Sequence, residues 1–121
     1  VNGLVGSEMC IRDRDRNNYI LEGSRSNVFW VISNSLFTRK NNVLPGITRR
    51  TIIENSPIPI LFGKLNIFDI NRVDELFLTN SGSGIIPVKK IDSIIINNGL
   101  PGPITVKLLE LFSLWSKKSF K

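Results

Sequence analysis

The sequence of 121 residues predicts an α+β fold of one domain, in which strands and helices are mixed along the chain. Short apolar segments rich in Ile, Val and Phe, which are typical of strands, alternate with segments whose apolar residues recur at helical spacing. Tight polar turns such as Ser33-Asn34 predict antiparallel hairpins between some of the strands. These hairpins argue against a simple parallel wound sheet, because parallel strands need long crossover connections.

The first half of the chain contains a predicted hairpin followed by a helix. Residues 28–32 read Val-Phe-Trp-Val-Ile, which is typical of a strand buried on both faces, and a two-residue turn leads back into residues 36–38. A helix is expected to begin near Ile47. It must end by Asn55, because the following Ser-Pro-Ile-Pro cannot continue a helix. Further short strands are expected at residues 19–21 and 60–62.

The second half of the chain ends in a longer helix. Asn66, with Asp69 three residues later, predicts an N-cap and a short helix. Residues 75–79 predict a strand that runs into the polar turn 80–84. In residues 104–118 the apolar side chains fall at helical spacing, and we interpret them as a packing face. Strands are also expected at residues 85–88 and 91–96, with a tight turn at Asn98-Gly99.

Composition limits the kinds of site that the chain can carry. The 41% hydrophobic and 21% charged shares are ordinary for a globular protein, and no apolar run approaches the ~20 residues of a membrane-spanning helix. Residues 11–16 are charged where a signal peptide would be apolar, so a cytoplasmic location is expected. The chain has no His, so Cys10 has no imidazole to activate it, and His/Cys zinc sites are excluded.

The formal net charge of +6 raises the question of nucleic-acid binding. The basic residues are scattered, however, and the densest group, residues 117–121, is explained by a helix end that complements its own dipole. Aromatic residues do not interleave with Arg and Lys as they do in single-strand binders. We therefore expect neither nucleic-acid nor membrane partners.

A Pro-Gly turn that opens directly into a helix is the first candidate binding site. The helix starting at Ile47 carries no acidic residue in its first turn, so its N–H groups and partial positive charge are available to an anion. Gly46 permits close approach of a ligand, and Thr48 adds a hydroxyl beside Arg49 and Arg50. Phosphate is the natural ligand. Taken alone, an ordinary loop-to-helix junction explains the same residues.

Two further polar loops interrupt apolar stretches, at residues 22–27 and 80–84, and both are expected at strand ends, where ligands are often held. The run Ser81-Gly82-Ser83-Gly84 offers two hydroxyls and a backbone able to wrap an oxyanion. Each loop also has a plainer interpretation. The second is then a small-residue turn, and Glu22 with Arg25 in the first is a surface ion pair.

In this order and spacing, the loops resemble the class IV aminotransferases, the fold-type IV enzymes that use pyridoxal 5'-phosphate. The resemblance covers residues from about Asn17 to Trp115. It implies the C-terminal cofactor-binding domain of that fold, a barrel-like mixed sheet with flanking helices. The segments that carry it are Glu-Gly-Ser-Arg-Ser-Asn-Val-Phe (22–29), Leu-Pro-Gly-Ile-Thr-Arg (44–49), Asp-Glu-Leu-Phe-Leu-Thr-Asn-Ser (74–81), Ile-Pro-Val (86–88) and Gly-Leu-Pro-Gly-Pro-Ile-Thr (99–105).

The resemblance also implies roles for particular residues. Glu22 would meet the pyridine nitrogen of pyridoxal phosphate, where a carboxylate keeps the ring protonated. Ile47 and Thr48 would bind the phosphate through backbone N–H groups and the Thr hydroxyl, and Ser81 would also contact the phosphate. The substrate carboxylate would lie close to the backbone of Ser81, Gly82 and Ser83, with Asn27 in a supporting role.

The chain departs from the family pattern at the catalytic residue. The family's Schiff-base lysine precedes the glutamate by some tens of residues, whereas the first lysine here is Lys40, after Glu22. We therefore assign no catalytic residue and expect this chain to be inactive. By the same comparison we expect the family's N-terminal domain to be missing and the helix after the phosphate turn to be cut short at residues 55–59.

Residues 1–14 differ in composition from the Ile- and Asn-rich remainder, and they resemble translated sequencing-adapter read-through. We expect them not to be native, and residues 15–121 to be a fragment containing the C-terminal pyridoxal-phosphate domain. The intact parent is expected to be a homodimer that acts on a small amino-acid-like substrate. Residues Leu78 to Ile85 favour the aminodeoxychorismate lyase branch slightly, with branched-chain aminotransferase as the alternative. From another class, the alternative is a small basic, non-catalytic binding module.

Overall fold

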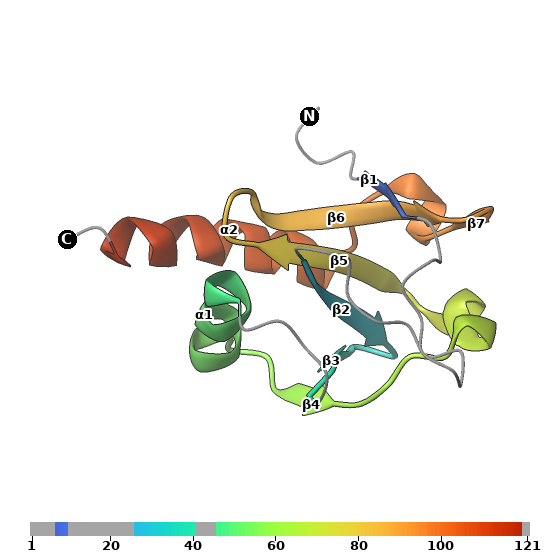
Figure 1. Ribbon diagram of the computed structural model, residues 1–121, viewed down its shortest axis with the longest axis horizontal. Helices are drawn as coiled ribbons and strands as arrows, with labels where there is room; N and C mark the ends of the chain where they lie inside the picture. The colour runs from blue at the N-terminus through green and yellow to red at the C-terminus, as the bar shows by residue number, and fades with distance from the viewer. Residues whose placement is uncertain (1–6, 10–25, 41–45, 120–121) are drawn as a thin grey trace.

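The computed structural model describes residues 7–9, 26–40 and 46–119, which form an open mixed sheet with helices on its faces (Figure 1). Strands run in the order β1-β6-β5-β2-β3-β4, and β7 pairs with β6. The pairs β2–β3, β2–β5, β5–β6 and β6–β7 are antiparallel, while β3–β4 and β1–β6 are parallel. The strands are β1 Ser7–Met9, β2 Asn27–Ile32, β3 Ser35–Thr38, β4 Ile60–Phe62, β5 Glu75–Asn80, β6 Gly84–Ile91 and β7 Ile94–Ile95.

Strand β2 at the centre of the sheet is buried on both faces, as its apolar sequence predicts, because its side chains alternate between two separate cores. Val28 and Trp30 belong to one core, while Phe29 and Val31 belong to the other. In the second core Phe29 stacks on Phe77 of β5, with ring centroids 4.9 Å apart. The sheet therefore has no solvent-facing side along β2.

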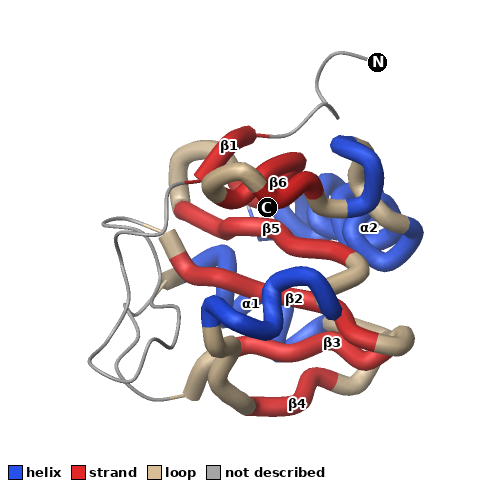
Figure 2. Tube along the Cα trace, turned by 90° about the vertical axis from the view of Figure 1, so that its right-hand side faces the viewer, coloured by secondary structure: helices blue, strands red, loops and turns tan. Residues whose placement is uncertain are grey.

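The two α-helices cover one face of the sheet. Helix α1 (Ile47–Asn55) contributes Ile52, and helix α2 (Pro103–Ser119) contributes Leu108, both to the core that contains Phe29. The short 3-10 helix η2 (Ile67–Arg72) brings Ile70 to the opposite core. Figure 2 shows η2 crossing in front of β2, with α1 and α2 behind the sheet.

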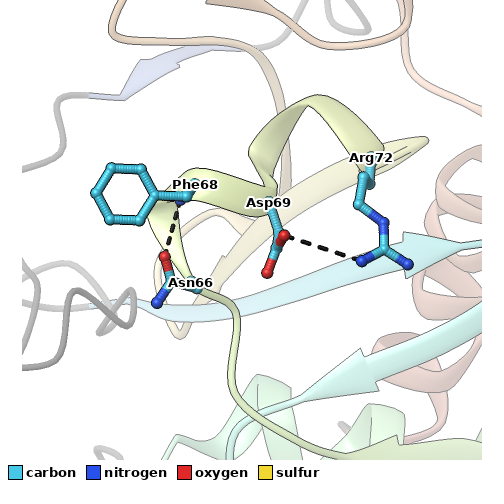
Figure 3. A network of polar contacts seen from close by, with 4 residues as sticks. All are labelled: Asn66, Phe68, Asp69 and Arg72. Atoms are coloured by element: carbon cyan, nitrogen blue, oxygen red, sulfur yellow. Dashed lines mark hydrogen bonds and ion pairs between the residues drawn. The ribbon is translucent and has the colours of Figure 1, made fainter.

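The structure confirms most of the predicted elements and adjusts two of them. The hairpin turns through Ser33 and Asn34, both with positive φ, and α1 ends at Asn55 as expected. Asn66 caps η2 by accepting the Phe68 N–H at 2.9 Å (Figure 3). The predicted short helix there is a 3-10 helix. Residues 84–91 form one strand instead of two, which leaves only Ile94–Ile95 for β7.

The fold class is confirmed as a mixed sheet with flanking helices, although the sheet stays open in the part of the chain that the structure describes. Strand β1 lies in the segment predicted not to be native, and that assignment remains a prediction. The expected strand at residues 19–21 lies outside the described residues. Within the described ranges, no helix is long and apolar enough to cross a membrane.

Candidate anion-binding site

The start of helix α1 has the features of an anion-binding site. Gly46 is its N-cap in an extended conformation, without a side-chain hydrogen bond to the helix, and the first turn has no acidic residue. The first turn closes when Arg50 N–H donates to the Gly46 carbonyl at 3.0 Å. The amide groups that precede Arg50 in this turn have no intrahelical acceptor, so the helix N-terminus presents donors and partial positive charge. Ile47, at its tip, is 70% exposed.

Gly46 lies against the side chain of Asn27, the buried first residue of β2. A Cβ at position 46 would collide with the Asn27 amide oxygen, so the absence of a side chain is what permits this approach. Gly46 therefore packs the start of α1 against the start of a central strand. Asn27, which the sequence places in a supporting role, contacts the helix start.

Thr48 connects α1 to the turn between β5 and β6. Its side chain is buried, and its hydroxyl donates to the main-chain carbonyl of Asn80 at 2.8 Å. Asn80 ends β5 and pairs with Gly84 at the start of β6. Residues 46–50 and the loop 80–84, both singled out by the sequence, thus meet at one end of the sheet, where Figure 1 shows the β5–β6 turn beside α1.

The turn itself is closed by a side chain. The Ser83 N–H donates to Asn80 Oδ1 at 2.6 Å, an Asx-type closure, while Ser81, Gly82 and Ser83 are exposed. Gly84 follows with φ of +72°, and a Cβ there would lie 2.8 Å from the ring of Phe112 on α2. The turn is therefore anchored by α1 at one end and by α2 at the other.

The start of α2 provides a contrast with the start of α1. The carboxylate of Glu75 accepts N–H groups from Thr105 at 2.7 Å and Ile104 at 3.2 Å, so a buried acid from β5 caps this helix. Gly102 has no room for a side chain because Glu75 lies against it. The Gly-Pro-Ile-Thr segment thus has a structural role, and its helix N-terminus is already occupied by an anionic group.

A half-open cavity of about 650 Å³ adjoins the start of α1 on the side toward β4. Its described lining is mainly basic and apolar, and Arg49 is fixed there by donating to the Arg39 carbonyl at 3.0 Å. The turn 81–83 does not contribute to the lining. The described lining residues are Lys40, Gly46, Ile47, Arg49, Arg50, Ile53, Glu54 and Phe62.

The structure therefore brings together part of the predicted site. Thr48 and Asn80 are in direct contact, which places Ile47 on the neighbouring helix start and the Ser81–Ser83 turn at the same end of the sheet. Glu22 lies outside the described residues. Sequence reasoning assigned no role to Asn80, although an Asn at a strand end before small residues is a recognisable signal for an Asx turn.

Comparison with known proteins is consistent across three kinds of match. The family model described as amino-transferase class IV matches residues 10–91. A probable branched-chain-amino-acid aminotransferase of Thermotoga maritima is 34% identical over 101 residues, covering 79% of this chain and 37% of that protein. The chain thus spans about a third of the length of the curated relatives it matches.

Two solved structures share the fold. The Escherichia coli branched-chain amino acid aminotransferase superposes with a TM-score of 0.75 at 33% identity, over 82% of this chain and 35% of that one. A second branched-chain amino acid aminotransferase, complexed with N-(5'-phosphopyridoxyl)-L-glutamate, gives a TM-score of 0.74 at 27% identity, also over 82% and 35%. These relatives favour the branched-chain alternative over the lyase interpretation of the sequence.

Proposed function

Because the chain belongs to the class IV aminotransferase family, we propose that it supplies the phosphate-binding part of the pyridoxal-phosphate site in a branched-chain amino acid aminotransferase. The observation that carries the proposal is the uncapped start of α1, with no acidic residue in its first turn, linked to the β5–β6 turn by the Thr48–Asn80 hydrogen bond. The parent enzyme is proposed to act on amino acids as a cytoplasmic homodimer, as the sequence suggests.

The residues present fit a phosphate at this position. A dianion needs several N–H donors, a local positive potential and room for close approach, and the start of α1 provides all three at Gly46, Ile47 and Thr48. Arg49 and Arg50 add positive charge to the neighbouring cavity wall. The same test excludes the start of α2, because Glu75 already fills it with negative charge.

The proposed roles of the residues are binding and orientation. Backbone N–H groups at Ile47 and Thr48 hold the phosphate, Ser81 adds a hydroxyl, and Gly82 and Ser83 lie near the substrate carboxylate. The buried Thr48 hydroxyl donates its proton to Asn80, so its contribution is to hold the two loops together rather than to donate to the ligand. Glu22 is proposed to face the pyridine nitrogen. Bound pyridoxal phosphate supplies an electron sink for carbanion chemistry at the substrate.

The proposed phosphate site is tested by placing a negative charge at residue 47, at the start of α1. Ile47→Asp should lower the affinity of the full 121-residue chain for pyridoxal phosphate by about tenfold or more, since a carboxylate would compete for the helix N-terminus. Tryptophan fluorescence titration measures the affinity. Ile47→Asn is the matched neutral control and should bind nearly as well as the original chain.

The same pair of variants separates binding from folding. An acidic residue in the first turn stabilises a helix by about 0.3–1 kcal/mol, so Ile47→Asp should not lower the free energy of unfolding. Equal affinity of the Asp and Asn variants for pyridoxal phosphate would overturn the proposal that the start of α1 binds the phosphate. It would instead favour the small basic binding module as the chain's function.

We also propose that this chain holds the cofactor without covalent attachment, because its first lysine, Lys40, follows Glu22 instead of preceding it. Borohydride treatment of the chain with pyridoxal phosphate should leave no stoichiometric adduct on a specific lysine. Peptide mass spectrometry measures this directly. A single lysine labelled in full would contradict the proposal and identify a catalytic residue.

A further inference from the structure

Asn80 occupies a position that links three parts of the proposed site. Its main-chain carbonyl accepts the Thr48 hydroxyl at 2.8 Å, which joins it to α1. Its side-chain oxygen accepts the Ser83 N–H at 2.6 Å, which closes the β5–β6 turn. Its pairing with Gly84 opens the antiparallel ladder between the two strands. One residue thus determines where the turn sits relative to the helix start.

We propose that Asn80 is a positioning residue, which holds the Ser81–Ser83 turn in register with the N-terminus of α1 so that both can contact one anionic ligand. The proposal rests on the proposed function. Asn80 itself makes its contacts through Thr48 and Ser83, and neither contact needs the ligand to be present. The ligand class is a phosphate monoester, because the site combines helix amides with small hydroxylated residues.

The physical basis is preorganisation. An exposed turn of Ser, Gly and Ser has few packing contacts and a flexible glycine, so without a closing bond it would sample many conformations. The bond from Ser83 to Asn80 restricts those conformations before a ligand arrives. At the far end of the turn, Gly84 lies against the ring of Phe112, which leaves no room for a side chain. A preformed turn loses less conformational entropy on binding, and the difference appears as affinity.

The role of the Ser83 amide also follows from this arrangement. Its N–H is already donated within the turn, so its function is to shape the turn rather than to serve as the first donor to the ligand. Ser83 thus keeps its proposed place near the substrate carboxylate, while its amide serves to shape the turn, and hydrogen exchange at that single amide measures this role.

The experiment compares Asn80→Ala with Asn66→Ala in the full chain. Asn66 is the matched control because its Oδ1 accepts the Phe68 N–H at 2.9 Å in the same kind of local closure, on η2. Figure 3 shows that this closure belongs to the η2 segment, which lies on the opposite face of the sheet from α1. Both variants remove one side-chain acceptor, so both should lose similar unfolding free energy.

Pyridoxal phosphate binding and amide exchange are the two measurements. Asn80→Ala should weaken pyridoxal phosphate about tenfold and should speed hydrogen exchange at the Ser83 amide, whereas Asn66→Ala should change neither. Thr48→Val, which cuts the link to α1, should weaken binding to a similar extent while leaving Ser83 exchange slow. Exchange at Ser83 should stay slow in Thr48→Val because the hydrogen bond from Ser83 to Asn80, which closes the turn, does not involve Thr48.

The outcomes separate this proposal from the proposed function. No binding of pyridoxal phosphate by the unsubstituted chain would overturn the proposed function and the positioning role with it. Normal binding by the unsubstituted chain, with equal affinity in Asn80→Ala, would overturn the positioning role alone. Where Asn80→Ala does not fold, Asn80→Asp retains the acceptor and should keep the Ser83 amide protected. Fast exchange at Ser83 in Asn80→Asp would also overturn the proposal.

Discussion

Single residues at the site are constrained by contacts that their neighbours in sequence do not reveal. Gly46 faces Asn27, Gly84 faces Phe112 and Gly102 faces Glu75, and each glycine leaves room for a side chain from a distant element. Only Gly84 of these three also requires a positive φ. Most of the close approaches therefore reflect packing rather than backbone conformation.

The contact at Gly46 can be tested by adding one methyl group. Gly46→Ala should lower the free energy of unfolding by about 1–3 kcal/mol, because the new Cβ would overlap the Asn27 side chain. Urea denaturation measures the change. Gly63→Ala is the matched control, since a Cβ at position 63 would lie 3.7 Å from the Phe37 side chain and 4.0 Å from the Trp30 side chain, in ordinary contact.

A double variant shows whether Asn27 is the cause. Asn27→Ala should remove most of the penalty of Gly46→Ala when the two are combined, since the colliding oxygen is then absent. Strictly additive losses would show instead that the cost of Gly46→Ala arises elsewhere in the turn.

At the scale of elements, the two α-helices differ in how their N-termini are satisfied. Helix α2 receives a carboxylate from β5, whereas α1 has neither a side-chain cap nor an acidic residue in its first turn. Capping groups usually come from the residues that precede a helix, so a cap from a strand about thirty residues earlier is not visible in local sequence. The residues around the two helix starts therefore do not show that α2 is capped and α1 is not.

Removal of the distant cap should lower the free energy of unfolding of the chain. Glu75→Ala leaves two amides of α2 without their acceptor and should cost about 3 kcal/mol of unfolding free energy, while Glu75→Gln should cost about half as much. Chemical denaturation followed by circular dichroism provides the measurement.

Asp74 provides the control next to it in sequence. Its Oδ2 accepts the Ser33 N–H at 2.8 Å at an exposed position, so Asp74→Ala should cost about 1 kcal/mol or less. If Glu75→Ala lowers the free energy of unfolding no more than Asp74→Ala does, the capping role of Glu75 is contradicted.

At the scale of the whole molecule, the sheet is stabilised by two cores, and the candidate site lies at the edge of one of them. Helices α1 and α2 share the core that contains Phe29 and Phe77. The position of the β5–β6 turn therefore depends on both helices, since Thr48 comes from one and Phe112 from the other. Docking of α2 on the sheet is a condition for the site's geometry.

The docking of α2 can be weakened at one buried residue. Leu108→Ala should lower the free energy of unfolding by about 2–5 kcal/mol, because Leu108 is fully buried and its loss leaves a cavity. Leu114→Ala on the same helix should change it by less than about 0.5 kcal/mol, because Leu114 is 55% exposed. Similar losses at the two positions would contradict the described packing face.

Local sequence patterns were sufficient to predict most of the elements and the family. Apolar runs, a Ser-Asn turn, the Ser-Pro-Ile-Pro stop after α1 and the Asn66 cap are local signals, and local physics is enough to interpret them. The order of the polar loops was likewise sufficient to indicate the class IV aminotransferases, to which the family match extends over residues 10–91.

Which loops meet, and which contacts each side chain makes there, became visible in the tertiary structure alone. The Thr48 hydroxyl is directed to Asn80, 32 positions away in sequence, and the carboxylate of Glu75 occupies the start of α2. The open sheet, with its two separate cores, likewise depends on strand pairing between distant segments. Hydrogen bonds across such separations form only once the sheet has brought their partners together, so no local pattern can reveal them.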